Sequence, residues 1–120
     1  MRRFLTSIIV GAVAAAPVTA QVVDAASANA GEVRVLDKLT GEVTDITLQV
    51  GETWAVGYLK VTLSACRYPT GNPNGDAFLA LDVLYQDSPT FAGWMLASSP
   101  ALNAMDHPRY DVWALRCITS

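Results

Sequence analysis

The sequence predicts a mainly β protein: a small antiparallel β-sandwich or barrel of six to seven strands with one short helix, stapled by a disulfide. Three observations predict this fold class. Apolar and polar residues alternate with a period of two in several short segments. Glycine, proline, asparagine and aspartate separate these segments at short intervals, as turn residues do. Two cysteines, Cys66 and Cys117, lie far apart in the sequence and are available for one bond.

The first two strands are expected to form a hairpin. Residues 43–50 alternate between an apolar and a more polar face, which is typical of a half-buried strand. Residues 33–36 form a strand candidate ahead of it. Residues 37–41 contain an aspartate and a glycine, which turns favour, so a loop of about five residues is predicted between the two strands.

The next stretch is predicted to be one broken strand or two. Residues 53–56 and 58–66 have strand character, and Gly57 between them marks a bend or a bulge. Strict alternation within residues 58–66 places Cys66 on the polar face. A disulfide inside the domain therefore requires a bulge or a twist near Ala65.

Further strands follow in the second half of the chain. Residues 68–76 form a loop rich in proline, glycine and asparagine, and the strongly apolar residues 77–85 form a central strand. A turn at residues 86–89 leads to a short strand over residues 91–96. The closing strand covers residues 110–118 and places three side chains on one face: Trp113, Leu115 and Cys117.

One short helix is expected before the closing strand. Ser99 is the predicted N-cap, and Pro100 occupies the first helical position, where its missing N–H is harmless. Residues 101–105 extend the helix by little more than one turn. Pro108 then disfavours helical geometry at the residue before it, so the helix ends there.

The N-terminus has the layout of a cleavable secretory signal. Arg2 and Arg3 precede an uncharged apolar run over residues 4–16, and small residues follow up to Ala20. The run is shorter than the roughly 20 residues that span a bilayer. We expect cleavage after Ala20, export to the periplasm, and no integral membrane segment after cleavage.

The expected organisation has three parts. Residues 1–20 are a signal peptide, residues 21–31 a flexible lead rich in alanine and serine, and residues 32–120 a single β domain. Without the signal, six basic residues face eleven acidic ones, a formal charge of −5. This charge argues against nucleic acid or anionic lipid as a partner, because both select basic patches.

Cys66 and Cys117 are expected to pair, because an exported chain meets an oxidising compartment and no other cysteine is present. On the chain-entropy model, closing this loop stabilises the fold by about 4 kcal/mol. The alternative is a zinc site, which needs about four ligands. His107 is the only histidine, so no metal and no cofactor are expected.

The C-terminal third carries a long, specific string. It runs over residues 91–100 (FAGWMLASSP) and 106–113 (DHPRYDVW) and ends at Cys117, and residues 35–38 (VLDK) belong to the same pattern. These residues resemble a family of exported envelope proteins of alphaproteobacteria, known only as a domain of unknown function, number 2155 in its series. The resemblance covers roughly residues 32–118. It implies an exported, single-domain, disulfide-capable protein and assigns no activity.

No catalytic residue is assigned. The ingredients of a serine hydrolase are present in five residues: Ser98, Ser99, Asp106, His107 and Asp111. No Gly-x-Ser-x-Gly elbow surrounds either serine, and the predicted helix start already accounts for both. Asp82 is the one acid at an unusual position, inside an apolar strand. An exposed strand face, or a salt bridge to Arg67 or Arg116, explains it more simply.

Aromatic residues are the best candidates for a binding surface. At least two of the three tryptophans are expected to be largely buried, because a domain this small needs them in its core. The predicted binding patch comprises four residues: Trp94, Met95, His107 and Tyr110.

We therefore expect a non-enzymatic binding or interaction module of the cell envelope. Its preformed loop and short helix would dock against an envelope protein. The alternatives are a small-ligand or glycan-binding domain, and an envelope hydrolase centred on His107.

Overall fold

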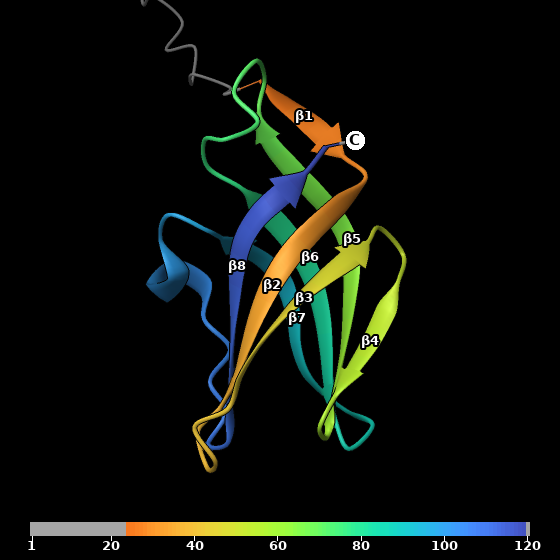
Figure 1. Cartoon of the computed structure of the whole chain (residues 1–120), viewed down its shortest axis with the longest axis vertical. Helices are drawn as coiled ribbons and strands as arrows, with labels where there is room; N and C mark the ends of the chain where they lie inside the picture. The colour runs from red at the N-terminus through yellow and green to blue at the C-terminus, as the bar shows by residue number, and fades with distance from the viewer. Residues whose placement is uncertain (1–23, 120) are drawn as a thin grey trace, which may run out of the picture.

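Two antiparallel sheets make up the part of the chain that the structure, a computed structural model, describes (residues 24–119; Figure 1). In the larger sheet four strands lie side by side in the order β1 (Ala25–Ala28), β5 (Leu59–Pro69), β6 (Phe78–Tyr85) and β7 (Ser88–Leu96). The fifth strand, β4 (Thr53–Val56), pairs with β5 on the same edge as β1.

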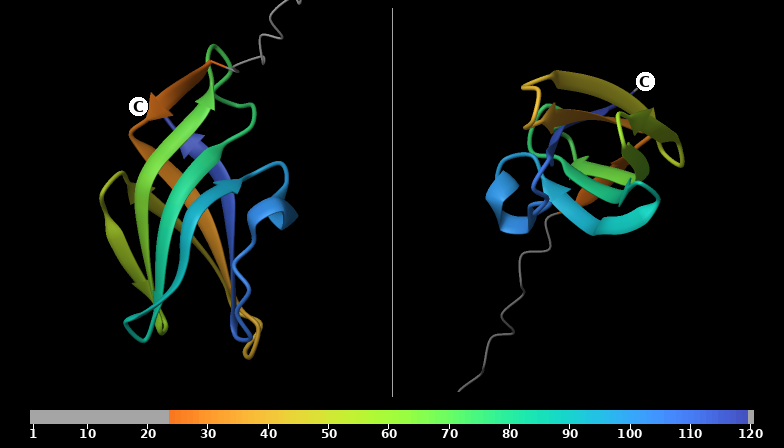
Figure 2. Two further views of the ribbon diagram at one scale, coloured as in Figure 1. Left: turned by 180° about the vertical axis from the view of Figure 1, so that it is seen from behind. Right: turned by 90° about the horizontal axis from the view of Figure 1, so that it is seen from below.

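The smaller sheet has the order β3 (Val43–Gln49), β2 (Ala30–Asp37) and β8 (Tyr110–Ile118). The crossover from β7 to β8 contains one 3₁₀ turn, η1 (Pro100–Asn103). Seen from below, the two sheets lie face to face as two layers (Figure 2). No helix among residues 24–119 is both long and apolar enough to cross a membrane.

The core lies between the two layers because alternate residues of each strand point inward. The inward positions are almost all aliphatic, and the most deeply buried of them are at most 3% exposed. These are Val33, Val35, Ile46, Leu48, Leu59, Val61, Leu63, Leu79, Leu81 and Val83. Aliphatic residues from both sheets therefore fill the interior, which leaves little room there for large aromatic rings.

The mainly β fold class is confirmed, with eight strands in the described residues where six to seven were predicted. The extra strand, β1, lies in the segment predicted to be a flexible lead, as do the first two residues of β2. Residues 25–28 read Ala-Ala-Ser-Ala and show no alternation, yet their backbone pairs with β5 from Ala28↔Cys66 to Ala25↔Pro69. The predicted signal peptide and residues 21–23 lie outside the described residues.

A bulge in β5 brings Cys66 into the core. The β5–β6 register shifts so that Leu63 pairs with Leu81 and Ala65 with Ala80, which leaves Ser64 as the extra residue. The bulge reverses the alternation. Cys66 is therefore buried, and the predicted irregularity near Ala65 is confirmed.

A second bulge corrects the prediction for β8. Val33 pairs with Ala114 and Glu32 with Arg116, so Leu115 is the extra residue. Before the bulge the inward residues are Tyr110, Val112 and Ala114, and after the bulge the inward residue is Cys117. The prediction that Trp113, Leu115 and Cys117 share one face is wrong, because the bulge interrupts the alternation between them.

The β6–β7 hairpin is tighter than predicted. Gln86 and Asp87 have φ values of 47° and 66°, as a two-residue type I′ turn requires, and β7 already begins at Ser88. Pro89 is tolerated because β7 is an edge strand and its register with β6 shifts at this point. In η1, Pro100 lies in the first turn as predicted, whereas the side chain of Ser99 makes no capping hydrogen bond.

The Cys66–Cys117 disulfide joins β5 of the larger sheet to β8 of the smaller one, with Cα atoms 5.8 Å apart. The predicted pairing is confirmed. Gly31 of β2 packs against the bond: a Cβ there would lie 3.1 Å from Cys66 Sγ and 3.1 Å from Leu79 Cδ2. The disulfide therefore links the two layers at a place where a side chain at position 31 would fit only if its neighbours moved by a few tenths of an ångström.

Candidate functional site

Tyr110 closes the lower end of the sandwich, where the β2–β3, β4–β5 and β6–β7 turns lie in Figure 1. It is 2% exposed, and its hydroxyl accepts a 3.3 Å hydrogen bond from the backbone N–H of Tyr58. Gly57, in the β4–β5 turn, has a φ of 57°, and a Cβ there would lie 2.5 Å from the Tyr110 hydroxyl. Both the backbone conformation and the space therefore require glycine at this position.

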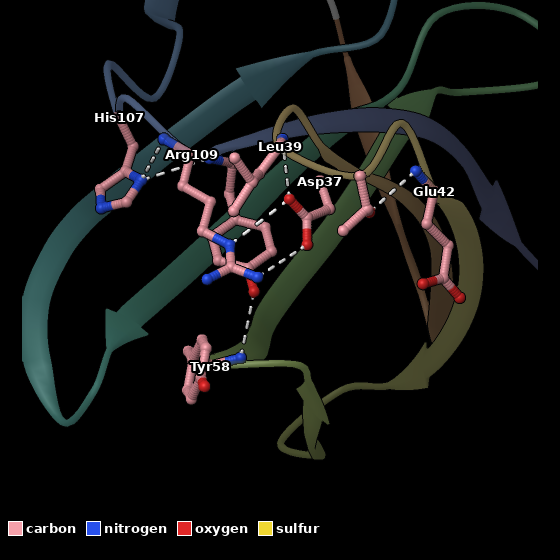
Figure 3. Close-up of polar contacts among 8 residues, drawn as sticks. Asp37, Leu39, Glu42, Tyr58, His107 and Arg109 are labelled. Atoms are coloured by element: carbon pink, nitrogen blue, oxygen red, sulfur yellow. Dashed lines mark hydrogen bonds and ion pairs between the residues drawn. The ribbon is translucent and has the colours of Figure 1, made fainter.

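Arg109 and Asp37 form an ion pair beside Tyr110 (Figure 3). The Arg109 Nη2 lies 3.1 Å from Asp37 Oδ2, and the guanidinium is 5.0 Å from the ring centroid of Tyr58 and 5.3 Å from that of Tyr110. Hydrogen bonds from Arg109, aided by the N–H of Leu39, lower the pKa of Asp37. The same pairing raises the pKa of Arg109, so both groups are charged at neutral pH.

His107 orders the start of β8. Its Nδ1 accepts hydrogen bonds from the backbone N–H groups of Arg109, at 3.1 Å, and Tyr110, at 3.2 Å (Figure 3). Its ring lies against Tyr85, with centroids 4.4 Å apart. One ring nitrogen is thus occupied by the backbone and one ring face by a tyrosine, which is the environment of a structural histidine near a turn.

Asp76, in the loop after β5, forms hydrogen bonds with Ser98, which follows the end of β7. Its carboxylate accepts hydrogen bonds from the N–H of Ala77, at 2.8 Å, and from the N–H and hydroxyl of Ser98, at 3.0 and 2.6 Å. Burial acts to raise the pKa of Asp76, but these hydrogen bonds outweigh it and the pKa is lowered. The hydroxyl of Ser98 is therefore hydrogen-bonded to Asp76, and His107 accepts its hydrogen bonds from the backbone, so the structure does not bring these two residues of the alternative hydrolase interpretation together.

The lower end contains a small cavity. Its volume is about 100 Å³, and its walls include Asp37, Glu42 and Tyr110. Pockets for small ligands generally occupy about 300 Å³ or more. In the described residues no group of three or more histidine, cysteine or acidic side chains is arranged to hold a metal ion. The geometry of the lower end is that of a structural closure.

The outer face of the larger sheet carries a different feature, an apolar depression around Trp94. Trp94 is 41% exposed, and the neighbouring positions in its row across the sheet, Ala80 and Ala65, carry small side chains. The depression has a volume of about 230 Å³ and is lined by Ala25, Arg67, Phe78 and Trp94. These residues come from four different strands, β1, β5, β6 and β7. We call this feature the Trp94 depression.

Arg67, on the rim of the Trp94 depression, is distinguished by its electrostatics. Its guanidinium lies 5.7 Å from the Trp94 ring centroid. Among the six lysine and arginine residues of the described chain, it alone forms no salt bridge. The other five form the pairs Arg34–Asp45, Lys38–Asp111, Lys60–Asp87, Arg109–Asp37 and Arg116–Glu32.

β7, the edge strand that carries Trp94, is partly covered by the segment that connects β7 to β8. η1 lies next to β7 (Figure 2), and the side-chain amide of Asn103 donates a 2.7 Å hydrogen bond to the backbone carbonyl of Trp94. A carbonyl at a sheet edge otherwise lacks a protein partner. The contact holds the backbone of Trp94 in place while its indole stays accessible.

Of the four residues of the predicted binding patch, the structure brings together His107 and Tyr110 at the lower end and places Trp94 and Met95 elsewhere. Met95 and Tyr110 are buried in the core at 3% and 2% exposure, His107 lies at the lower end, and Trp94 lies on the outer face of the larger sheet. The expectation that at least two tryptophans are largely buried is wrong. Trp54 is 45% exposed, Trp94 is 41% exposed, and Trp113 is half-buried, because aliphatic side chains already fill the interior.

Sequence reasoning did not identify Ala25, Arg67 and Phe78 as neighbours of Trp94. Their proximity arises from strand pairing across the larger sheet, which no local pattern reveals. Asp82, in contrast, lies where the simpler prediction placed it. It is exposed on the outer face and accepts a 3.0 Å hydrogen bond from the hydroxyl of Ser64.

Comparison with known proteins gives a family and one distant relative. The family model described as "Uncharacterized protein conserved in bacteria (DUF2155)" matches residues 31–117. An uncharacterized protein of Rickettsia prowazekii (strain Madrid E) is 32% identical over 92 residues, which cover 72% of this chain and 59% of the relative. This chain therefore matches about three fifths of the length of that protein. No solved structure matches the chain significantly.

Proposed function

This chain belongs to the DUF2155 family of uncharacterized proteins conserved in bacteria, and we propose that it acts as a non-enzymatic binding module of the cell envelope. The proposed contact surface is the Trp94 depression on the outer face of the larger sheet. The partner is an envelope protein that places an apolar side chain against the Trp94 ring.

The exposure of Trp94 is the single observation that carries this proposal. Tryptophan is enriched among the residues that dominate binding energies at protein interfaces, because its ring supplies a large contact area and loses little conformational entropy. Here Trp94 lies opposite Ala80 in the strand register, and its backbone carbonyl accepts a hydrogen bond from Asn103. The backbone that carries this anchor is thus held before any partner arrives, which lowers the entropy cost of ordering it on binding.

The chemistry of the rest of the described chain favours binding over turnover. His107 is engaged by the backbone, Ser98 by Asp76, and Asp82 lies in the open on a sheet face. A catalytic group must reach its substrate in a site that excludes water, and none of these three side chains lines the Trp94 depression. A binding role requires only the surface itself.

Export to the periplasm is part of the proposal. It is supported by the signal-like layout of residues 1–20 and by the disulfide, since such bonds persist mainly in oxidising compartments. We expect that N-terminal sequencing of the protein from the envelope fraction of its native cells starts at Gln21. Recovery of protein that retains Met1 as its dominant form would contradict cleavage after Ala20.

Site-directed photocrosslinking in living cells tests the contact surface. A benzophenone amino acid at Ala92, which is exposed two residues from Trp94 on the same strand face, is expected to give a discrete protein adduct. The same group at Thr47, exposed on β3 of the other sheet, is expected to give none. Equal labelling of one protein from both positions would place the contact elsewhere.

Trp94→Ala is expected to abolish that adduct, because loss of a central aromatic anchor typically weakens an interface by about 2 kcal/mol or more, roughly 30-fold in affinity. Trp54→Ala is the matched control, since Trp54 is equally exposed but lies on β4 and does not line the Trp94 depression. Thermal unfolding of both variants verifies that they fold. Persistence of the adduct in folded Trp94→Ala would overturn the proposal.

A further inference from the structure

Arg67 gives the Trp94 depression a chemical preference as well as a shape. Five of the six basic residues in the described chain are neutralised by a neighbouring carboxylate, whereas Arg67 has none within salt-bridge distance. Among the described residues, the guanidinium of Arg67 makes a cation–π contact with the Trp94 ring and no ion pair. In a domain rich in acidic groups, this one cation is thus left available to an external anion.

The position of Arg67 suits a carboxylate. A guanidinium that lies over an aromatic face keeps the N–H groups of its edge free, and these present a planar fork that matches the two oxygens of a carboxylate. The side chain belongs to β5 and is exposed, beside Phe78 in the register of the sheet. An anion bound there therefore has an apolar wall immediately next to it.

The size of the Trp94 depression limits the ligand. Its volume of about 230 Å³ lies below the roughly 300 Å³ at which pockets for drug-sized molecules begin. The depression therefore accommodates one or two side chains of a larger molecule better than a complete small ligand. Its shallow outline across four strands is also that of a protein-contact surface.

The surrounding charge excludes long polyanions. The chain from residue 21 carries a formal charge of −5, so its net charge repels an extended run of phosphates. Proteins that bind nucleic acid or anionic membranes rely on several cations acting together. A single carboxylate next to an apolar side chain requires only one cation, which Arg67 supplies.

We propose that the Trp94 depression binds an acidic segment of a partner protein. An apolar or aromatic side chain of that segment rests against Trp94 and Phe78, and a neighbouring aspartate or glutamate pairs with Arg67 through two parallel N–H···O hydrogen bonds. This inference rests on the proposed function and specifies the partner chemistry of the same surface.

Selection from a random peptide display library tests this preference with a defined probe. The bait is the oxidised protein purified from the envelope, and the parallel baits are its Trp94→Ala, Arg67→Gln and Arg116→Gln variants. Arg116 is exposed on the opposite sheet, so its variant removes the same charge from another face. We expect peptides with an acidic residue adjacent to an apolar one, enriched by the native and Arg116→Gln baits only.

Binding of one such peptide is then measured by fluorescence anisotropy. Arg67→Gln is expected to weaken it by about tenfold or more, the loss typical of a hydrogen-bonded ion pair, while Arg67→Lys weakens it less. Amidation of the acidic side chain in the peptide is expected to remove the difference between native protein and Arg67→Gln. Because Arg67 is exposed, these variants should keep the native melting temperature.

The outcomes separate the two proposals. Peptides that require Trp94 but show no acidic preference would overturn the role of Arg67 and leave the binding module intact. Absence of any Trp94-dependent peptide, together with a negative crosslinking result, would overturn the proposed function itself. Equally strong, Arg67-dependent binding to vesicles of phosphatidylglycerol would assign the cation to a lipid headgroup and overturn the acidic-segment proposal.

Discussion

Reduction of the Cys66–Cys117 disulfide is expected to lower the free energy of unfolding by about 4 kcal/mol. The bond closes a loop across a sequence separation of 51 residues, and the chain-entropy model assigns a loss of this size to opening it. Domains of this size have a total stability of only about 5–15 kcal/mol. The reduced protein is therefore expected to be marginally folded at physiological temperature.

Urea unfolding with and without a reducing agent measures this effect, with tryptophan fluorescence as the signal. The control is the Cys66→Ala/Cys117→Ala double variant, which is expected to be as unstable as the reduced protein and to be unaffected by the reducing agent. The chain has no other cysteine, so no alternative thiol complicates the comparison. A change below about 1 kcal/mol in the free energy of unfolding on reduction would show that packing between the sheets, and not the covalent link, holds β5 and β8 together near Cys66 and Cys117.

The double variant also examines the packing around the bond. Gly31 lies so close to Cys66 Sγ that a Cβ there would make a tight 3.1 Å contact. Replacement of both cysteines by the smaller alanine removes the two sulfur atoms and leaves a small void beside Gly31. A double variant that is clearly less stable than the reduced native protein would measure the cost of that void.

Tyr110→Ala is expected to destabilise the protein by about 3–5 kcal/mol, the range seen when a large buried aromatic side chain is removed. The ring is almost completely buried at the lower end, and it contacts the guanidinium of Arg109 and lies near the rings of Tyr85 and His107. Its removal leaves a cavity and deprives the Arg109–Asp37 pair of its apolar support.

Tyr110→Phe is the matched comparison, because it keeps the ring and deletes only the hydroxyl. We expect a loss of about 0.5–1.5 kcal/mol, the usual net contribution of one hydrogen bond. The donor left behind is the backbone N–H of Tyr58, whose hydrogen bond to Tyr110 is partly buried although the residue is exposed. Denaturant unfolding of both variants gives the two values. Similar losses in both would mean that the hydrogen bond, and not burial of the ring, closes the lower end.

The Tyr110→Phe substitution should not alter the chemistry of the Trp94 depression. Tyr110 does not line it, and Phe at this position preserves the core. Tyr110→Phe is therefore expected to retain the crosslinked adduct and the peptide affinity of the native protein. The lower end and the binding surface are separate parts of the same sandwich.

Local pattern alone was sufficient for most of the sandwich. Residues 43–50, 58–66 and 77–85 alternate or are continuously apolar, and each corresponds to an observed strand, β3, β5 and β6. The hairpin loop at residues 37–41 was visible from its turn residues. β1 was not visible, because a run of alanine and serine has no amphipathic signal and is held by backbone pairing with β5.

The bulges show where local pattern becomes insufficient. The bulge in β5 could be predicted because a cysteine with only one possible partner had to leave the polar face. The bulge at Leu115 in β8 offered no such constraint, and the side-chain directions of Trp113 and Leu115 were wrongly predicted. A single extra residue reverses every later side chain, and only the pairing with β2 determines where it falls.

The sequence by itself determined that this protein is a small β domain with a pair of cysteines that can form one disulfide, because strand periodicity, turn residues and cysteines can be recognised without the spatial arrangement. The match of residues 31–117 to the family model places it in the DUF2155 family. Only the tertiary structure decided which residues share a surface. Trp94, Arg67, Phe78 and Ala25 come from four strands, and their meeting depends on the order and register of those strands in the sheet. The absence of a salt-bridge partner for Arg67 among the described residues is likewise a matter of spatial arrangement, since a charge is neutralised by its neighbours in space and not by those in sequence.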